Sequence, residues 1–134
     1  MKKSLCLIIA AIVVLASCKV DFPTVSADRF EELLSEPGVQ LIDARHADEY
    51  ETGYIAGSTN IDVTKDNFKK EALKVLDKSR KVCVHCQKGG RGAKAAAILK
   101  RAGFDVYNLE GGFDAWVEAG KPYVVPETGT LPVD

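Results

Sequence analysis

Two kinds of hydrophobic pattern alternate along the chain. Short apolar runs bounded by turn residues indicate buried strands, which we expect at residues 39–42, 58–63, 81–85 and 106–109. Longer stretches have the pattern of helices, which we expect at residues 27–35, 47–52, 67–76, 92–102 and 113–119. Strands that alternate with helices favour a parallel sheet. The pattern therefore predicts an α/β fold with a central, mostly parallel sheet and helices on both faces.

Local signals support this division and point to one edge of the sheet. Ser26 is a candidate N-cap for the first helix, and Pro37 with Gly38 ends that helix. In open parallel sheets, binding and catalytic sites lie beyond the carboxyl ends of the strands. Cys86 directly follows the expected strand at 81–85, so it is placed where such a site would form.

Residues 1–18 have the pattern of a secretory signal. Lys2 and Lys3 precede an apolar run at 5–15, which is shorter than the roughly 20 residues that a membrane-spanning helix needs. The run leads into Leu-Ala-Ser-Cys, which resembles the bacterial lipobox and implies cleavage before Cys18 and lipid attachment to it. A plain secretory signal and an uncleaved anchor are the other interpretations. We expect a protein of the bacterial cell envelope, lipid-anchored to a membrane and facing the periplasm or the exterior.

These signals divide the chain into a signal peptide at 1–18, a tether at 19–25, one domain at 26–122 and an irregular tail at 123–134. A chain of 134 residues is long enough for one domain with its own core. Without the signal peptide it carries 16 basic and 19 acidic side chains, and no basic cluster stands out. We therefore expect no nucleic-acid partner.

The expected domain contains two cysteines, Cys83 and Cys86. Cys83 falls inside the expected strand, and three extended residues separate the two Cα atoms by roughly 10 Å, which is beyond disulfide reach. No second pair of ligands accompanies them to hold zinc, and we expect no metal. We interpret Cys83 as a core residue, whereas the role of Cys86 depends on the loop that follows it.

That loop, Cys-Gln-Lys-Gly-Gly-Arg-Gly at 86–92, combines three features that favour the thiolate form of Cys86. Its glycines let the backbone curl so that successive N–H groups point inward. The helix that follows presents its positive end to the loop, and Lys88 and Arg91 add full charges. The same arrangement would hold an anionic sulfur attached to Cys86. The alternative is a structural cysteine beside an ordinary glycine turn.

The loop resembles the active-site loop of the rhodanese family, whose Cys-x-x-Gly-x-Arg pattern is present at Cys86, Gly89 and Arg91. The segment from Leu41 to Ile61 resembles the family's Leu-Ile-Asp-x-Arg and Gly-His-Ile-x-Gly-Ala motifs. The segment from Asn108 to Trp116 resembles its Leu-x-Gly-Gly motif, which ends in tryptophan. The resemblance covers most of residues 25–120 in the family's order, and it implies a rhodanese-like fold and sulfur-transfer chemistry.

The resemblance also implies a mechanism. Cys86 would attack thiosulfate or a similar donor and carry one sulfur atom as a persulfide, which a thiol or cyanide would accept. No cofactor is implied beyond this covalent intermediate. The residues of the loop would bind the substrate, and these are Gln87, Lys88, Gly89, Gly90, Arg91 and Gly92.

Individual loop residues have further implied roles. Lys88 matches a position where thiosulfate-using members often carry a cation. Arg91 matches an arginine that often ties the loop to the Asp-x-Arg motif, here Asp43 and Arg45, which would then brace the loop. Gly92 departs from the family pattern, because serine or alanine is common there, and we expect this glycine to loosen the start of the helix.

Two other classes of protein have to be weighed against the sulfurtransferase. Cysteine phosphatases and arsenate reductases also use a thiolate within a ring of amides, but their pattern has five residues between cysteine and arginine, and here four separate Cys86 from Arg91. The other class is a non-catalytic rhodanese module that binds a protein partner. His85 lies beside Cys86, but neighbouring strand residues point to opposite faces, so we expect it to be mainly structural.

Overall fold

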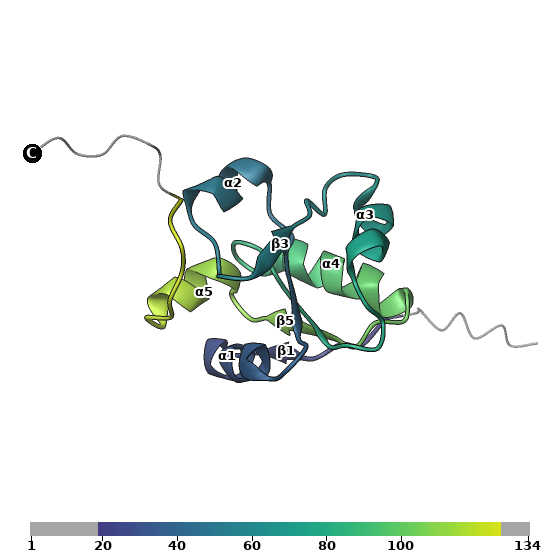
Figure 1. Cartoon of the computed structure of the whole chain (residues 1–134), viewed down its shortest axis with the longest axis horizontal. Coiled ribbons are helices and arrows are strands. Elements are labelled where there is room, and N and C mark those ends of the chain that lie inside the picture. Colours follow the sequence, from purple (N-terminus) through teal and green to yellow (C-terminus); the bar gives the residue numbers. More distant parts are fainter. Residues whose placement is uncertain (1–18, 127–134) are drawn as a thin grey trace, which may run out of the picture.

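Five parallel strands form the centre of the molecule (Figure 1). The computed structural model describes residues 19–126, so the signal sequence and Cys18 lie outside the described residues. The strands lie side by side in the order β1-β5-β4-β2-β3. Their bounds are Thr24–Val25 for β1, Gln40–Asp43 for β2, Ser58–Asn60 for β3, Val82–His85 for β4 and Val106–Leu109 for β5. This confirms the predicted α/β fold with a parallel sheet.

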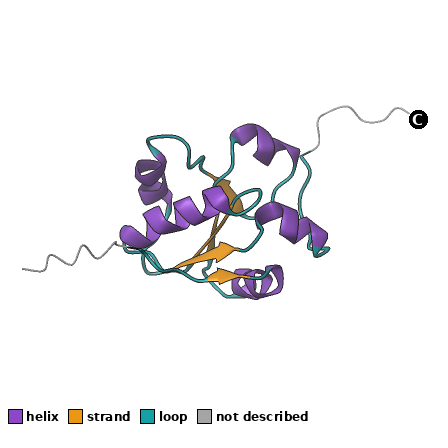
Figure 2. Cartoon of the chain, turned by 180° about the vertical axis from the view of Figure 1, so that it is seen from behind, coloured by secondary structure: helices purple, strands orange, loops and turns teal. Residues whose placement is uncertain are grey.

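Helices lie on both sides of this sheet, as the two opposite views show (Figures 1 and 2). Their bounds are Ala27–Ser35 for α1, Ala47–Thr52 for α2, Phe68–Val75 for α3, Gly90–Arg101 for α4 and Gly112–Glu118 for α5. The Ser26 side chain caps α1 by accepting a hydrogen bond from the Arg29 N–H, as the sequence predicted.

Alternation along the strands creates two cores, one on each face of the sheet. Val82 and Val84 of β4 pack with the α3 and α4 side chains, among them Phe68, Ala95 and Leu99. The residue between them, Cys83, points to the other face and packs with α1 and α5, which contribute Phe30, Leu33, Phe113 and Trp116. Because both faces of β4 are covered, all of its residues are buried.

The structure differs from the predicted organisation at the two ends of the domain. Thr24 and Val25, expected within a tether, pair with Asn108 and Leu109 as the edge strand β1. At the other end, Val124 from the expected tail forms an antiparallel bridge with Tyr54. In both segments, backbone groups that a free segment would expose to water are paired with the domain.

Two element boundaries also move. Helix α4 begins at Gly90 rather than at residue 92, and β3 ends at Asn60 rather than at residue 63. Within residues 19–126, no helix is long and apolar enough to cross a membrane.

Candidate active site

Strand β4 delivers Cys86 to the carboxyl edge of the sheet, one residue beyond its last strand residue. The Cys86 side chain is only 1% exposed. Its Sγ accepts a hydrogen bond from the backbone N–H of Gly89 at 3.1 Å. A buried thiolate needs such donors, because nothing else replaces the water that it loses.

The loop turns sharply at Gly89 and then becomes helix. Gly89 has φ +119°, a conformation that side-chain-bearing residues rarely adopt, and it is the N-cap of α4. The Ala93 N–H donates to the Gly89 carbonyl at 2.9 Å and closes the first helical turn. The amides of Gly90, Arg91 and Gly92 precede that bond, so they have no partner within the helix. Together with the helix dipole they make this end of α4 a favourable place for negative charge.

Gly92 lies against the cysteine and permits the close approach of three groups. A Cβ on Gly92 would lie 2.7 Å from Asn108 Oδ1, 3.2 Å from Cys86 N and 3.4 Å from Cys86 Sγ. The residue was expected to loosen the start of the helix. Instead it is buried in the first turn of α4, where its missing side chain lets Asn108 approach beneath the loop.

Helix α5 supports the loop from beneath. Its Phe113 N–H donates to the Cys86 carbonyl at 2.7 Å, and its Asp114 N–H donates to the Gln87 carbonyl at 3.0 Å. This approach requires Gly112, since a Cβ there would lie 2.5 Å from the Cys86 oxygen. Gly111 and Gly112 both have positive φ, at 72° and 62°. The Gly-Gly pair is therefore a turn that the backbone geometry demands.

A buried ion pair holds the loop from the side of β2. Arg45 Nη2 donates to Asp43 Oδ2 at 2.7 Å, and the two side chains are 1% and 0% exposed. Arg45 Nη1 also donates to the Gln87 side-chain oxygen at 2.9 Å. Gln87 in turn donates through Nε2 to the Asp114 carboxylate. Gln87, the second residue of the cysteine loop, thus links the Asp43–Arg45 pair to α5.

Arg91 holds the loop by a different contact from the one expected. Its guanidinium bonds to both carboxylate oxygens of Glu49, at 2.5 and 2.8 Å, and so joins the loop to α2. The hydrogen-bonded pair raises the pKa of Arg91 and lowers the pKa of Glu49. The tie to Asp43 and Arg45 runs through Gln87 instead. Lys88 is exposed at the surface of the loop.

The remaining candidates occupy buried or capping positions. Burial raises the pKa of the Cys83 thiol to about 12, which is consistent with a core residue. His85 is completely buried; its Nδ1 donates to the Cys86 carbonyl at 3.1 Å, and its Nε2 lies 3.6 Å from Asp43 Oδ2. Burial lowers the pKa of His85. His46 is the N-cap residue of α2 and bonds to Asp62 at 2.7 Å.

Sequence reasoning missed Glu49, Asp114 and Asn108 as neighbours of the loop. Glu49 and Asp114 each lie in the first turn of a helix that follows a strand. In a parallel sheet those turns share one edge with Cys86, and this is the signal that could have found them. Within residues 19–126, no group of histidine, cysteine and acidic side chains is arranged to hold a metal ion.

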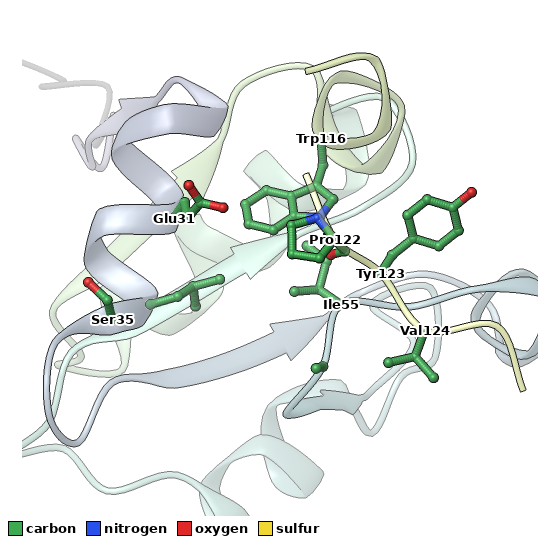
Figure 3. A pocket seen from close by; sticks show the side chains of 9 residues that line it. Glu31, Ser35, Ile55, Trp116, Pro122, Tyr123 and Val124 are labelled. Atoms are coloured by element: carbon green, nitrogen blue, oxygen red, sulfur yellow. Dashed lines mark hydrogen bonds between the residues drawn. The ribbon is translucent and has the colours of Figure 1, made fainter. Parts of the chain in front are cut away.

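Two hollows border the C-terminal segment, by which we mean residues 122–126. The first has a volume of about 300 Å³ and lies between α1 and residues 122–124, with Trp116 and Ile55 in its wall (Figure 3). None of the cysteine-loop residues lines it. The second has a volume of about 510 Å³ and includes Gln87 of the loop. Tyr123 lines both hollows, and only the second one reaches the candidate active site.

A parallel α/β sheet that places a buried cysteine at a glycine-rich loop and the start of a helix is the arrangement that the three sequence motifs predict. Residues 26–119 match the family model of the Rhodanese-like domain. The chain belongs to this family, and its sheet and helices are the rhodanese fold. The family that the three motifs indicated is thereby confirmed.

The similar proteins include enzymes and single domains. Thiosulfate sulfurtransferase GlpE of Pseudomonas paraeruginosa is 36% identical over 84 residues, which cover 62% of this chain and 74% of that protein. The tRNA uridine(34) hydroxylase of Hamiltonella defensa is 33% identical over 106 residues, 75% of this chain but only 29% of that enzyme. The crystal structure of a rhodanese-related protein from Thermoplasma volcanium is similar with a TM-score of 0.69 and 30% identity, covering 78% of this chain and all of that one.

Proposed function

We propose that this chain is a sulfurtransferase that carries one sulfur atom as a persulfide on Cys86. The observation that supports this best is the position of Cys86 Sγ. It is buried at the start of α4 and accepts a hydrogen bond from the Gly89 N–H, and the first amides of the helix, which have no partner within the helix, follow directly in the chain. The similarity to a thiosulfate sulfurtransferase supports the same chemistry, because the match covers 62% of this chain and 74% of that enzyme.

In the first half-reaction the Cys86 thiolate attacks the outer sulfur of thiosulfate. The new bond joins Sγ to that sulfur, and the old sulfur–sulfur bond breaks with its electron pair leaving on sulfite. The product is a negatively charged persulfide, whose charge the amides at the start of α4 stabilise because they are already in place. Lys88, exposed at the loop surface, attracts the dianionic donor.

In the second half-reaction an acceptor takes the outer sulfur. A thiolate or cyanide attacks that sulfur, the bond to Sγ breaks, and its electron pair returns to Cys86 as the thiolate. The products are an acceptor persulfide or thiocyanate, and no cofactor or metal takes part. Two separate steps through a covalent intermediate predict ping-pong kinetics.

The tight loop favours sulfur transfer over hydrolysis of a phosphate ester. Four residues separate Cys86 from Arg91, and Arg91 is bound to Glu49. A cysteine phosphatase has to keep a whole phosphoryl group on Sγ within the loop, whereas only one sulfur atom stays on Sγ after sulfite leaves, and a thiol that is 1% exposed has little space around it. We therefore do not propose phosphatase activity, and the experiment described next would detect it.

Mass spectrometry of the domain after treatment with thiosulfate tests this proposal. We expect a gain of one sulfur atom on Cys86, which cyanide removes as thiocyanate. Cys86→Ser should lose all uptake, and Cys83→Ala is the matched control that should keep it. Phosphate-ester hydrolysis without sulfur uptake would favour the phosphatase. If the protein shows neither sulfur uptake nor hydrolysis, a binding module is favoured.

We also propose that the mature chain is lipid-anchored at Cys18 and faces the periplasm or the exterior. Because β1 begins at Thr24, only residues 19–23 separate the lipid from the sheet, which is roughly 17 Å when fully extended. The domain would then work close to the membrane surface. Cys18→Ala should move the protein from the membrane fraction to the soluble fraction of a bacterial host, and unchanged fractionation would contradict the anchor.

A further inference from the structure

The second hollow lies directly beside the cysteine loop and has no role in the loading step. It has a volume of about 510 Å³ and is open to solvent. We refer to it as the α5 hollow. Its walls come from α2, the cysteine loop, α5 and the C-terminal segment, and they are formed by Thr52, Gln87, Phe113, Asp114, Val117, Glu118 and Tyr123.

The lining of the α5 hollow combines polar side chains with exposed apolar ones. Val117 is 38% exposed and Tyr123 is 46% exposed, and Val125 follows close by at 60%. These are three of the five large hydrophobic side chains that are exposed within residues 19–126. Grouped exposed apolar side chains beside a reactive site are typical of a surface that contacts a partner.

The charge of the α5 hollow is negative. Asp114 and Glu118 are four residues apart on α5, a spacing that brings two side chains onto the same side of a helix. No lysine or arginine is among the lining residues, and Lys88 of the cysteine loop is not among them. A dianion such as thiosulfate is repelled by such a surface, whereas a cationic molecule is attracted to it.

The shape of the α5 hollow is fixed before anything binds. Tyr123 packs edge-to-face on Phe113 with 5.6 Å between ring centroids. The Trp116 Nε1–H donates to the Pro122 carbonyl at 2.8 Å, and Val124 is bridged to Tyr54. A preformed surface needs little ordering when it binds, so modest contacts are enough for a useful affinity.

The α5 hollow is also connected to the thiol by short contacts. Phe113 lines it and donates its N–H to the Cys86 carbonyl at 2.7 Å. Gln87 lines it and directly follows Cys86. A chain bound in this hollow therefore lies next to the loop that holds the persulfide.

From these observations we propose that the α5 hollow docks the sulfur acceptor, and that this acceptor is a polypeptide whose cysteine is flanked by basic and apolar side chains. This inference rests on the proposed sulfurtransferase function. The acceptor thiolate attacks the outer sulfur, the bond to Cys86 Sγ breaks, and Cys86 leaves as the thiolate while the acceptor becomes a persulfide. Basic side chains near the acceptor thiolate offset the repulsion between the two anions that must meet.

The test uses two amidated, N-acetylated peptides that each carry one cysteine and two leucines. They differ only in three flanking residues, which are lysine in one peptide and glutamate in the other. The protein is first loaded with thiosulfate and freed of excess donor, and mass spectrometry verifies the Cys86 persulfide. The rate of persulfide loss is then measured with each peptide and with cyanide.

Two variants separate docking from the reactivity of the peptides themselves. Glu118→Lys reverses one charge in the α5 hollow, at the end of a helix where lysine is well tolerated. Asp105→Lys is the matched control, because Asp105 is exposed and precedes β5 at the opposite, amino edge of the sheet. We expect Glu118→Lys to lower the ratio of lysine-peptide to glutamate-peptide rates by roughly tenfold at low salt, and Asp105→Lys to leave it unchanged.

The outcomes distinguish this inference from the function on which it rests. Added salt should reduce the preference of the unaltered protein for the lysine peptide. If cyanide removes the persulfide but Glu118→Lys and Asp105→Lys give the same ratio, docking in the α5 hollow is wrong while the sulfurtransferase stands. If no persulfide forms on Cys86, the sulfurtransferase itself is wrong and the inference falls with it.

Discussion

At the scale of single residues, Gly92 leaves no room for a side chain beneath the cysteine loop. Asn108 is buried, its Oδ1 has no hydrogen-bond partner, and it occupies the space that a side chain on Gly92 would need. An orphaned polar atom in a buried position is costly. A side chain at position 92 would have to displace this oxygen, which lies 2.7 Å from the place of its Cβ.

Gly92→Ala should destabilise the protein by about 1–2 kcal/mol. Alanine in the first turn of a helix gains up to about 1 kcal/mol in helix propensity, but a contact of 2.7 Å to Asn108 Oδ1 costs about 1–3 kcal/mol. Urea unfolding measures the difference. Gly90→Ala is the control, because nothing lies within 4 Å of its added Cβ, and it should not destabilise. In an Asn108→Ala background the cost of Gly92→Ala should shrink, and an unchanged cost would contradict the contact.

Lys88→Ala should weaken the binding of the thiosulfate donor more than it slows the chemical step. Lys88 is exposed, and under the proposed function it would attract thiosulfate without contacting a buried charge, so its loss should raise KM for thiosulfate several-fold with kcat nearly unchanged. Steady-state kinetics over a range of salt concentrations measures this, since the effect of an exposed charge weakens with salt. Lys94→Ala on the exposed side of α4 is the matched control. Identical thiosulfate kinetics for both variants would remove Lys88 from donor binding.

The sequence predicted the positions of the candidate site residues that the backbone fixes, and it was less informative about the contacts of long side chains. Cys86 and the loop glycines lie where the motif placed them, because strand, turn and helix fix their positions. The predicted contact of Arg91 with the Asp43–Arg45 motif was wrong, because Arg91 binds Glu49. An arginine can reach several carboxylates at this edge of the sheet, and only the position of α2 decides that Glu49 is the nearest. Tertiary placement of that kind has no local signal.

At the scale of elements, the cysteine loop depends on the N-terminus of α5. Two backbone hydrogen bonds join them, to the carbonyls of Cys86 and Gln87. Both bonds require the backbones to approach more closely than a Cβ allows at Gly112. The Gly-Gly turn and the cysteine loop thus form one unit, although eighteen residues separate them in sequence.

Gly112→Ala should therefore cost more than an ordinary glycine substitution. Gly112 has φ +62° and a Cβ there would lie 2.5 Å from the Cys86 oxygen, so we expect a loss of about 3 kcal/mol or more and slower persulfide formation. Gly120→Ala is the matched control, with φ +73° and open space around it, and should lose only about 1 kcal/mol. Urea unfolding and thiosulfate loading measure the two effects. Equal losses for both variants would show that the approach to Cys86 is unimportant.

Most elements could be predicted, and the exceptions are short. Strands β2, β3, β4 and β5 and the five helices follow from apolar runs and their spacing, because burial against the sheet imposes those patterns. Strand β1 was missed since two residues, Thr24 and Val25, carry no pattern of their own. They become a strand because β5 offers an open edge, where the Asn108 and Glu110 amides donate to the Pro23 and Val25 carbonyls.

At the scale of the whole molecule, a buried histidine links the stability of the fold to pH. Burial lowers the pKa of His85 in the folded protein, opposed by the Asp43 carboxylate at 3.6 Å and assisted by Arg45. The unfolded chain binds a proton at the ordinary value near 6.5, whereas the folded chain does not. The free energy of unfolding should thus be fully retained above about pH 6.5 and fall as the pH drops below it.

The contribution of His85 can be isolated by comparing pH profiles. Its share of the slope below pH 6.5 is at most about 1.4 kcal/mol per pH unit. His85→Asn retains a donor near the Cys86 carbonyl but cannot be protonated, so its unfolding free energy should fall less steeply between pH 6.5 and pH 5. Urea unfolding at several pH values measures both slopes. Parallel profiles would mean that other groups set the acid stability.

The deep position of Cys86 has a consequence for timing if the chain transfers sulfur as proposed. A persulfide in open water reacts quickly with oxidants and with stray thiols, whereas this one would form on a side chain that is almost fully enclosed. Uptake of sulfur from the donor and its transfer to the acceptor could then take place at different times. Each molecule would then store a single sulfur atom on Cys86 and release it only when a suitable recipient arrives.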